Sequence, residues 1–379
     1  MTDKRLLYIT TWDFTNAEAD GVCKKILSQI KVFKKAFYVV DYTYIKHGKT
    51  FINIDNKEVL LGYNHHLSKF AAHKLIAEYL KDDNDYKYVY IRYNKADYGF
   101  INLLSILNEH FSKIVVEIPT YPYDNECRSL RDRVILVIDK LFRGKIKKYI
   151  STFVNYYSDE PTIFGAKSIR ISNGIDVDSI RIVNAEAANN TVIDLIGVAA
   201  FTPSHGYDRL IKSIGEYYKT GGNRDLIFHI VGYGMLEKKY RKLIKQYDIQ
   251  NHVILYGKMY GDKLDRLYDQ MDIGVCTLAY YRVANGMISN ELKSREYASK
   301  GLPMISGGPI DEFNHNKYRY SLELGDNESI IDINRIIDFY DRVYSMDRLD
   351  VIAHIRKYAE IHCGMDVAME PIILEYHDC

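Results

Sequence analysis

A basic and an acidic side chain lie one helical turn apart in residues 292–305, a segment that the sequence predicts to be a short helix leading into a strand. Lys293 and Glu296 share one helix face, because residues three apart project in the same direction. The free amides of the first helical turn add partial positive charge, which suits a phosphate. Gly301 and Pro303 end the helix. The pattern favours a ligand that carries a diphosphate and a ribose, although an ordinary surface ion pair would have the same spacing.

Glycines at predicted strand-to-helix turns add candidate phosphate contacts, because a glycine lets backbone amides approach a phosphate closely. The glycines at these turns are Gly21, Gly206, Gly232 and Gly234. His205 precedes one of them and is predicted to give a proton or a hydrogen bond to the phosphate. Arg209 follows on the same helix and is predicted to face the same charge. A capping histidine and tight turns that need a positive φ are alternatives that the sequence leaves open.

The loop of residues 279–290 comes directly before the Lys293 helix and is predicted to wrap the same ligand. Arg282 carries a fixed charge that suits bidentate contact with phosphate. Ser289, Asn290 and Leu292 complete the predicted contacts of this loop and of the helix start. A solvated loop arginine is an equally ordinary interpretation of Arg282.

Aromatic and acidic side chains in residues 119–126 predict a second site, for a saccharide. Tyr121 and Tyr123 offer ring faces and hydroxyls to a sugar. Asp124 and Glu126 are placed to accept a hydroxyl proton or to orient the hydroxyl. Arg92, at the end of a predicted strand, is a further candidate for this site. A structural turn rich in proline and tyrosine would look much the same.

Residues 128–148 carry eight basic residues against two acidic ones, interleaved with aliphatic side chains. Such a segment is typical of a helix that lies on anionic lipid. A helix that packs on the core and shows solvent a basic face would have the same composition.

The composition indicates a folded protein of about two domains, since the chain has 379 residues, 47% of them hydrophobic and 27% charged. A net charge of +1 gives no signal for nucleic acid. The five cysteines have no paired spacing, which favours a reducing cytoplasm over a disulfide or zinc framework. We expect neither a signal peptide nor a membrane-spanning helix.

Short apolar runs alternate with amphipathic stretches in both halves, which predicts an α/β protein with two mostly parallel sheets. The strands expected in the first half are residues 6–10, 37–40, 88–92 and 114–118, with an irregular edge or hairpin at 43–62. Those of the second half are 193–199, 226–231, 252–256, 273–278 and 303–306. A flexible junction is expected at residues 177–191, and residues 349–376 are predicted to be helical.

The segment Leu292-Lys293-x-x-Glu296-Tyr297-x-x-x-Gly301-x-Pro303 resembles the donor-site helix of bacterial glycosyltransferases of family 4. Three further motifs resemble that family in the same order along the chain. They are Glu117 to Glu126, Ser172-Asn173-Gly174-Ile175-Asp176 and His205 to Ile211. The resemblance implies the GT-B fold, in which two Rossmann-like domains face each other across a cleft and a C-terminal helix crosses back. The implied domains are residues 1–176 with about 360–379, for the acceptor, and 177–359, for the nucleotide sugar.

The resemblance also implies the parts of the chemistry. Lys293, Arg209, Arg282 and His205 would assist departure of the diphosphate, Glu296 would hold the ribose, and the backbone at Lys258 and Met259 would meet the base. No metal or other cofactor is implied. One departure concerns the sugar: many members carry a second glutamate eight positions before Glu296, but Ile288 stands there.

The expected activity is retaining transfer of a sugar from a nucleotide diphosphate sugar to a saccharide acceptor in making a bacterial surface polysaccharide, and the acceptor is expected to be joined to a lipid. The expected location is the cytoplasm, and the basic segment 128–148 adds contact with the inner face of the membrane as an open alternative. The oligomeric state, the base and the sugar stay open. A sugar-nucleotide 2-epimerase and a non-catalytic GT-B subunit that binds carbohydrate or a partner enzyme are the alternatives.

Overall fold

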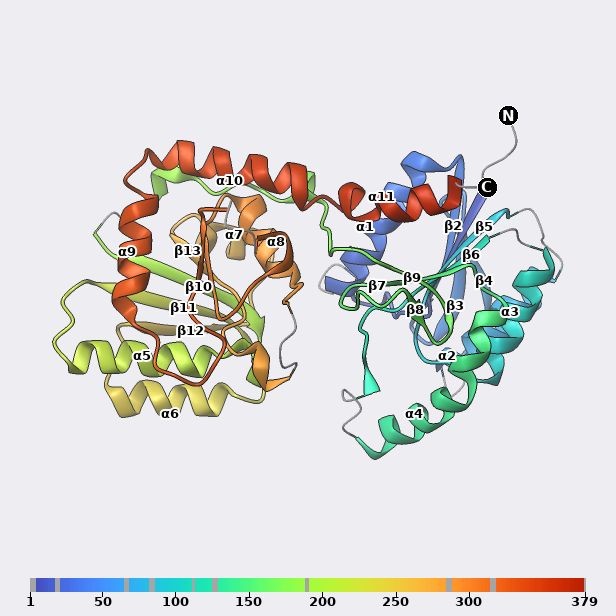
Figure 1. Cartoon of the computed structure of the whole chain (residues 1–379), viewed down its shortest axis with the longest axis horizontal. Helices are drawn as coiled ribbons and strands as arrows, with labels where there is room; N and C mark the ends of the chain where they lie inside the picture. Colours follow the sequence, from blue (N-terminus) through green and yellow to red (C-terminus); the bar gives the residue numbers. More distant parts are fainter. Residues whose placement is uncertain are drawn as a thin grey trace. The chain divides into compact units, whose positions relative to one another are not determined.

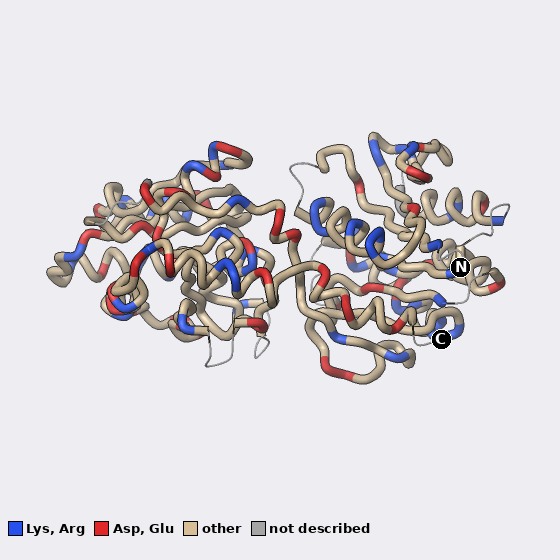
Figure 2. Tube along the Cα trace, turned by 90° about the horizontal axis from the view of Figure 1, so that it is seen from above, with Lys and Arg blue, Asp and Glu red and all other residues tan. Residues whose placement is uncertain are grey.

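A computed structural model of the chain describes residues 5–17, 21–64, 68–81, 86–110, 113–124, 129–187, 191–283, 288–313 and 318–377 (Figure 1). The chain divides into two compact units. Unit 1 comprises residues 1–172 and 368–379, and unit 2 comprises residues 173–367. Positive and negative side chains occur along the trace of both units (Figure 2).

Unit 1 is built on a nine-stranded sheet with the order β4-β3-β2-β1-β5-β6-β7-β9-β8. The strands are β1 (Arg5–Ile9), β2 (Val39–Lys46), β3 (Lys49–Ile54), β4 (Lys57–Tyr63), β5 (Tyr88–Arg92), β6 (Lys113–Glu117), β7 (Thr152–Asn155), β8 (Thr162–Ile163) and β9 (Ala166–Arg170). The run from β2 to β9 is parallel, whereas β3 and β4 add antiparallel at one edge. The irregular edge or hairpin predicted at residues 43–62 is therefore confirmed.

Helices cover both faces of this sheet (Figure 1). They are α1 (Gly21–Ala36), α2 (Ser68–Leu80), α3 (Tyr98–His110), α4 (Leu130–Phe142), the 3-10 helix η3 (Arg143–Lys148) and α11 (Met365–His377). The predicted basic segment thus divides into α4 and η3. From residue 368 onward α11 belongs to unit 1, where the hydroxyl of Tyr376 donates to the carbonyl of Val89 at 2.7 Å.

Unit 2 has a six-stranded sheet that is parallel throughout, in the order β12-β11-β10-β13-β14-β15. The strands are β10 (Ile193–Ala200), β11 (Leu226–Tyr233), β12 (Val253–Gly257), β13 (Ile273–Val275), β14 (Met304–Ser306) and β15 (Ser321–Glu323). Numbered within the unit, this is the order 3-2-1-4-5-6 of the Rossmann fold. The near-continuous aliphatic runs of β10 and β11 are what a strand covered on both faces needs.

The helices of unit 2 are α5 (Tyr207–Lys219), α6 (Glu237–Tyr247), α7 (Asp262–Tyr268), α8 (Leu292–Lys300), α9 (Ile333–Val343) and α10 (Arg348–His362). Helices α5 and α6 lie on one face of the sheet, and α7, α8 and α10 lie on the other (Figure 1). Residues 177–187 do not form a free linker, because Val177 and Val183 are buried in the core of unit 2. None of the helices in the described ranges is both long and apolar enough to cross a membrane.

Candidate functional site

The two sheets share a geometric feature that marks where ligands bind. In unit 2 the strand order reverses between the neighbouring strands β10 and β13. In unit 1 it reverses between β1 and β5. At such a switch point the loops that leave the carboxyl ends of two adjacent strands diverge and open a crevice, which is where open α/β sheets bind ligands.

At the switch point of unit 2, the loop after β10 is fastened to the loop after β13. The amides of Leu278 and Ala279 donate to the carbonyls of His205 and Ser204, both at 3.0 Å. Gly206 adopts a φ of 63° at the start of α5, and a Cβ atom there would lie 2.8 Å from the Cβ of Ala279. A glycine is therefore required by the close approach of the two loops, and it leaves the first amides of α5 at the crevice.

Lys293 lies at the start of α8 and pairs with Glu291, whereas the alternative interpretation of the sequence was an ion pair with Glu296. Its Nζ atom is 3.3 Å from a carboxylate oxygen of Glu291 and 5.4 Å from the ring centre of Tyr207. Apart from that ion pair, this buried Nζ has no hydrogen-bond acceptor among the described residues. Burial alone would lower the pKa of Lys293, but the negative charge of Glu291 raises it above its usual value. The side chain is thus a buried, charged ammonium with unused N–H groups.

Glu291 is a site residue that the motifs did not indicate. It occupies the N-cap position of α8, but its carboxylate turns away from the helix amides. It accepts hydrogen bonds from the amide of Thr277 at 3.0 Å and from the hydroxyl of Thr277 at 2.6 Å. Glu291 therefore joins the end of β13 to Lys293. The only sequence signal was an acidic residue directly before a predicted helix.

His205 is half-buried beside Lys293. Burial, and then the charge of Lys293, lower the pKa of His205 to about 2. The imidazole is consequently neutral near pH 7, so that it suits a hydrogen bond to a phosphate better than proton donation. Among the described residues its Nδ1 lies 3.4 Å from the hydroxyl of Thr202.

Arg209 is the predicted residue whose surroundings depart most from expectation. It is buried, and its guanidinium donates to the carbonyls of Ser329, Leu278 and Gly325 at 2.7, 3.0 and 2.6 Å. A planar fork of five donors suits such a cluster of carbonyl oxygens. Arg209 therefore clamps α5 to the loop after β15, which corrects the prediction that it faces the ligand.

Arg282 is engaged by two carboxylates. Its Nη1 donates to Asp208 at 2.9 Å, and its Nε and Nη2 donate to the two oxygens of Glu328 at 2.7 and 2.8 Å. The hydrogen bonds from Arg282 lower the pKa of Glu328 to about 2. Lys239 also pairs with Asp208, at 2.6 Å. The arginine is neither a solvated loop residue nor a free cation, because its charge is balanced within unit 2.

The glycines after β11 are explained by packing alone. Gly232 has a φ of 134°, and a Cβ atom there would lie 1.8 Å from the carbonyl oxygen of Ala199. A Cβ at Gly234 would lie 2.6 Å from the amide nitrogen of Phe201. At the next strand end Lys258 is exposed, with its Nζ 4.1 Å from the ring centre of Tyr233. Met259 packs against the core of unit 2.

The remaining donor candidates surround the start of α8. Ser289 forms a backbone bridge to Ile310. The side chain of Asn290 accepts a hydrogen bond from the amide of Asn173 at 2.9 Å. This bond joins the first residue of unit 2 to the segment directly before α8. Arg295, which sequence reasoning missed, is buried and paired with Asp311 at 2.6 Å. The half-buried Leu292 and Glu296 lie on the same helix. Burial first, and then the charge of Glu296, raise the pKa of Tyr268.

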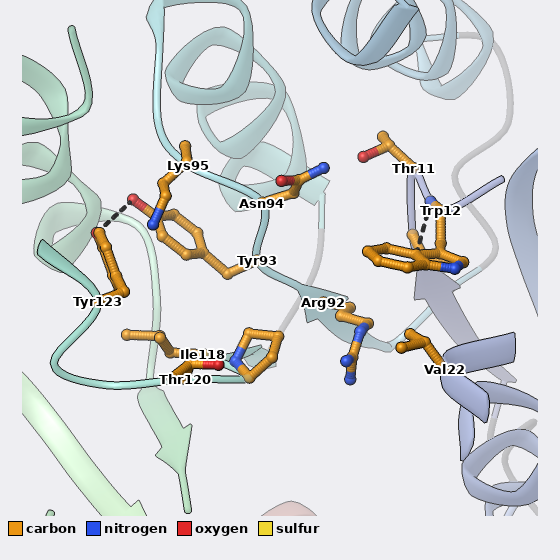
Figure 3. Close-up of a pocket in the computed structure, with 12 residues that line it drawn as sticks. Thr11, Trp12, Val22, Arg92, Tyr93, Asn94, Lys95, Ile118, Thr120 and Tyr123 are labelled. Carbon is orange, nitrogen blue, oxygen red and sulfur yellow. Dashed lines mark hydrogen bonds between the residues drawn. The ribbon is translucent and has the colours of Figure 1, made fainter. Parts of the chain in front are cut away.

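Unit 1 contains a pocket of about 360 Å³ at its own switch point (Figure 3). Side chains that follow three neighbouring strands and the start of α1 line it. These are Thr10, Thr11 and Trp12 after β1, Arg92, Tyr93, Asn94 and Lys95 at β5, Ile118, Pro119, Thr120 and Tyr123 after β6, and Val22 of α1. Trp12 lies at one end, Lys95 and Tyr123 at the other, and Arg92 between them (Figure 3). Trp12 is the single tryptophan of the chain, and neither it nor Lys95 was predicted.

A buried polar network holds Arg92 in place. Its guanidinium pairs with Glu117, which is completely buried and also accepts from Tyr90 at 2.6 Å and from Gln29 at 2.7 Å. Although burial would raise the pKa of Glu117, the charges of Arg92 and Lys25 hold it below its usual value. The pocket is therefore lined by a charged arginine whose position is fixed by a buried hydrogen-bond network.

The structure brings together only part of the predicted acceptor group. Tyr123 lines the pocket, with its ring centre 3.1 Å from the Nζ of Lys95. Tyr121 instead packs edge-on against Phe164, and Asp124 pairs with Arg143 at 2.7 Å and with Lys140 at 3.0 Å. Those two residues do not line the pocket.

Two predictions concern residues at the border of the described ranges. Gly21 is exposed at the first position of α1, and no atom of the described residues lies within 4 Å of the Cβ that a substitution would add. Glu126 lies outside the described residues.

Two Rossmann-like units, together with a last helix that returns to the first of them, place this chain in the GT-B fold class. The expected fold class is thereby confirmed. More narrowly, residues 178–288, all within unit 2, match the family described as glycosyl transferases group 1. The motif resemblance to bacterial GT-B glycosyltransferases agrees with this match.

The chain is also similar to individual proteins. The protein CapJ of Staphylococcus aureus is 31% identical over 141 residues, a stretch that spans 35% of this chain and 35% of CapJ. A glycosyltransferase from Rickettsia africae shares the fold with a TM-score of 0.65 and 12% identity, over 100% of this chain and 99% of that one. HepE of Anabaena, solved with UDP and glucose, has a TM-score of 0.61 and 12% identity, over 99% of this chain and 100% of that one.

Proposed function

We propose that this chain is a glycosyltransferase that moves a sugar from a nucleotide diphosphate sugar to a saccharide acceptor. The observation that carries the proposal is the buried ammonium of Lys293, which has unused N–H groups at the switch point of a group 1 domain. A buried cation of this kind is stabilised when an anion satisfies its remaining donors. The amides at the starts of α5 and α8 favour the same kind of anion. We infer that the anion is the diphosphate of the donor.

The chemistry asks mainly for positive charge at the leaving group. As the bond between sugar and phosphate breaks, the sugar acquires oxocarbenium character and the diphosphate gains negative charge. Lys293 is fixed by Glu291 before the donor arrives, so little reorganisation is needed at the moment of reaction. Neutral His205 adds a hydrogen bond, and Glu296 binds the ribose. Arg282 would stabilise the negative charge of the leaving diphosphate only if a phosphate replaced the exposed Glu328 as its partner.

The pocket of unit 1 is the acceptor site in this proposal. Its aromatic rings, Trp12, Tyr93 and Tyr123, offer faces to a sugar, and Arg92 and Lys95 suit an acidic saccharide or a phosphate. We further propose that the acceptor is joined to a lipid, that configuration is retained, that no metal is required, and that the product is a bacterial surface polysaccharide. The motif resemblance to family 4 glycosyltransferases supports these finer points.

Binding and turnover of the purified chain test the proposal. Thermal shifts with UDP, GDP and their sugars come first, because a ligand that binds the native state raises its apparent stability. Donor hydrolysis and transfer are then compared for the wild type, Lys293→Ala and the control Lys263→Ala, which removes an exposed lysine of α7. Loss of one preorganised charge predicts a decrease in turnover of roughly 100-fold to 1,000-fold for Lys293→Ala and no change for the control.

Three results would contradict the proposal. Near-normal turnover by folded Lys293→Ala would remove this residue from the chemistry. Isomerisation of a nucleotide sugar without acceptor would indicate an epimerase. A chain that neither binds nor hydrolyses any nucleotide sugar would be a non-catalytic subunit.

A further inference from the structure

Helix α4 exposes a continuous row of aliphatic side chains. Leu130, Val134, Val137 and Leu141 are 81%, 61%, 61% and 67% exposed. Their spacing of four, three and four residues places all four on one face of the helix. Single exposed aliphatic residues need no explanation, but a row of four along one helix face does. We call these four residues the α4 stripe.

Basic side chains border the α4 stripe. At 3.6 residues per turn, Arg133 and Lys140 fall along one side of it and Arg131 along the other. The following η3 adds Lys145, Lys147 and Lys148. All six of these side chains are exposed, and Asp132 is the one exposed acidic residue in residues 129–148. An apolar row between cationic borders is the arrangement with which a helix lies in the interface of an anionic bilayer.

The opposite face of α4 is locked to the pocket of unit 1. Asp139 is completely buried and accepts hydrogen bonds from the hydroxyls of Tyr93 and Tyr123 and, at 2.7 Å, from the amide of Ala96. Both tyrosines line the pocket. Leaving this buried carboxylate without its donors would cost folding free energy. Helix α4 is therefore not free to rotate about its axis and bury the α4 stripe. The outward orientation of the stripe is therefore a fixed property of the fold.

We propose that the α4 stripe and its basic borders dock unit 1 on a membrane surface that contains anionic lipid. The charge pattern favours lipid over a protein partner or a second copy, because lysine is depleted at protein interfaces. Size argues the same way, since a stable protein interface uses roughly 20–30 residues on each side. Docking on a membrane would bring unit 1 to a lipid-linked acceptor, and in this respect the inference rests on the proposed function. Vesicle binding is measured without a donor, so docking and glycosyltransferase activity can fail separately.

Vesicle sedimentation of the full chain tests the docking. The chain is mixed with vesicles of phosphatidylcholine alone or of phosphatidylcholine with phosphatidylglycerol, at low and high salt. We expect binding to the anionic vesicles that weakens as salt rises. Arg131→Gln with Arg133→Gln should weaken it by roughly 30-fold, since each arginine near an anionic surface contributes about a factor of five. The matched control, Lys238→Gln with Lys242→Gln on exposed positions of α6, should bind like the wild type.

A second pair of variants tests the stripe. Val134→Ser with Val137→Ser keeps a similar helix propensity and should weaken binding by about tenfold or more, because two aliphatic side chains no longer enter the interface. Its control replaces two exposed aliphatic residues of α10, as Leu349→Ser with Ile361→Ser. Donor hydrolysis should be unchanged in all four variants.

The proposal is overturned if the wild type does not bind anionic vesicles, or if the α4 variants bind as well as their controls. It is also overturned if sedimentation velocity shows a dimer that the α4 variants dissociate, because the stripe would then bind a second copy. Loss of vesicle binding with intact hydrolysis supports docking. Intact vesicle binding without any hydrolysis would contradict the proposed function and leave docking supported.

Discussion

The ion pair between Glu291 and Lys293 should be strongly coupled, and a double-mutant cycle measures this. Two opposite charges 3.3 Å apart attract by about 5 kcal/mol at an effective dielectric constant of about 20. Desolvation of both groups offsets part of that energy, whereas removing one partner leaves the other charge buried and costs about 3 kcal/mol or more. We therefore expect Glu291→Gln and Lys293→Met each to lower the free energy of unfolding of unit 2 by about 2–4 kcal/mol.

The double variant decides whether this reasoning holds. Replacing both partners removes the unpaired charge, so its loss should be smaller than the sum of the single losses by about 2 kcal/mol. Urea unfolding followed by a probe that reports on unit 2 gives the four free energies. The pair Glu237→Gln and Arg241→Met, an exposed ion pair of α6 at 2.8 Å, is the control, with a coupling below about 0.5 kcal/mol. If the coupling energy between Glu291 and Lys293 is no larger than that of the control pair, Glu291 and Lys293 do not form a strongly coupled buried ion pair.

Two further predictions concern His205 and Arg209. The folded-state pKa of His205, about 2, lies below the unfolded value of about 6.5, so the unfolded chain takes up the proton first as the pH falls. Stability is therefore retained above about pH 6.5 and declines below it, and His205→Gln should make the decline between about pH 6 and pH 4 shallower by up to 1.4 kcal/mol per pH unit in urea unfolding. A slope unchanged by the substitution would mean that the histidine protonates in the folded protein. Arg209→Met should lower the free energy of unfolding by about 3 kcal/mol or more, because buried carbonyls lose their donor. A stable variant that has lost turnover by 100-fold would instead return Arg209 to the reaction.

The regular elements were largely predictable because their apolar periodicity follows directly from burial. The strand predicted at 88–92 matches β5 residue for residue. The strand predicted at 273–278 is shorter, since β13 ends at Val275. Beyond it the amide of Thr277 bonds to the side chain of Glu291. A side-chain partner for a backbone amide leaves no periodic signal in the sequence.

The site was predictable in position more than in detail. Glycines at strand ends mark the turns, and Gly206 does lie at the switch point with Lys293 nearby. The partner of a charged side chain, however, depends on tertiary distance. Helix spacing alone predicts that Arg209 faces the crevice. In the structure its guanidinium instead donates to backbone carbonyls of residues that lie more than 65 positions away in the sequence. The pocket of unit 1 needed Trp12, Arg92 and Tyr123 to meet from three separate strands.

The return of α11 to unit 1 has a consequence for biosynthesis. Glu375 accepts a hydrogen bond from Thr152 at 2.7 Å and pairs with Lys167 at 2.6 Å, and Tyr376 reaches the backbone of β5. All of unit 2 is translated between these contacts and their partners. Unit 2 is contiguous in sequence and can complete its core on the ribosome, whereas unit 1, although it emerges first, must wait about 200 residues for its last helix. At a rate of roughly 5–20 residues per second, the first sheet spends on the order of ten seconds or more with the site of that helix uncovered, which is the interval in which a chaperone would be needed.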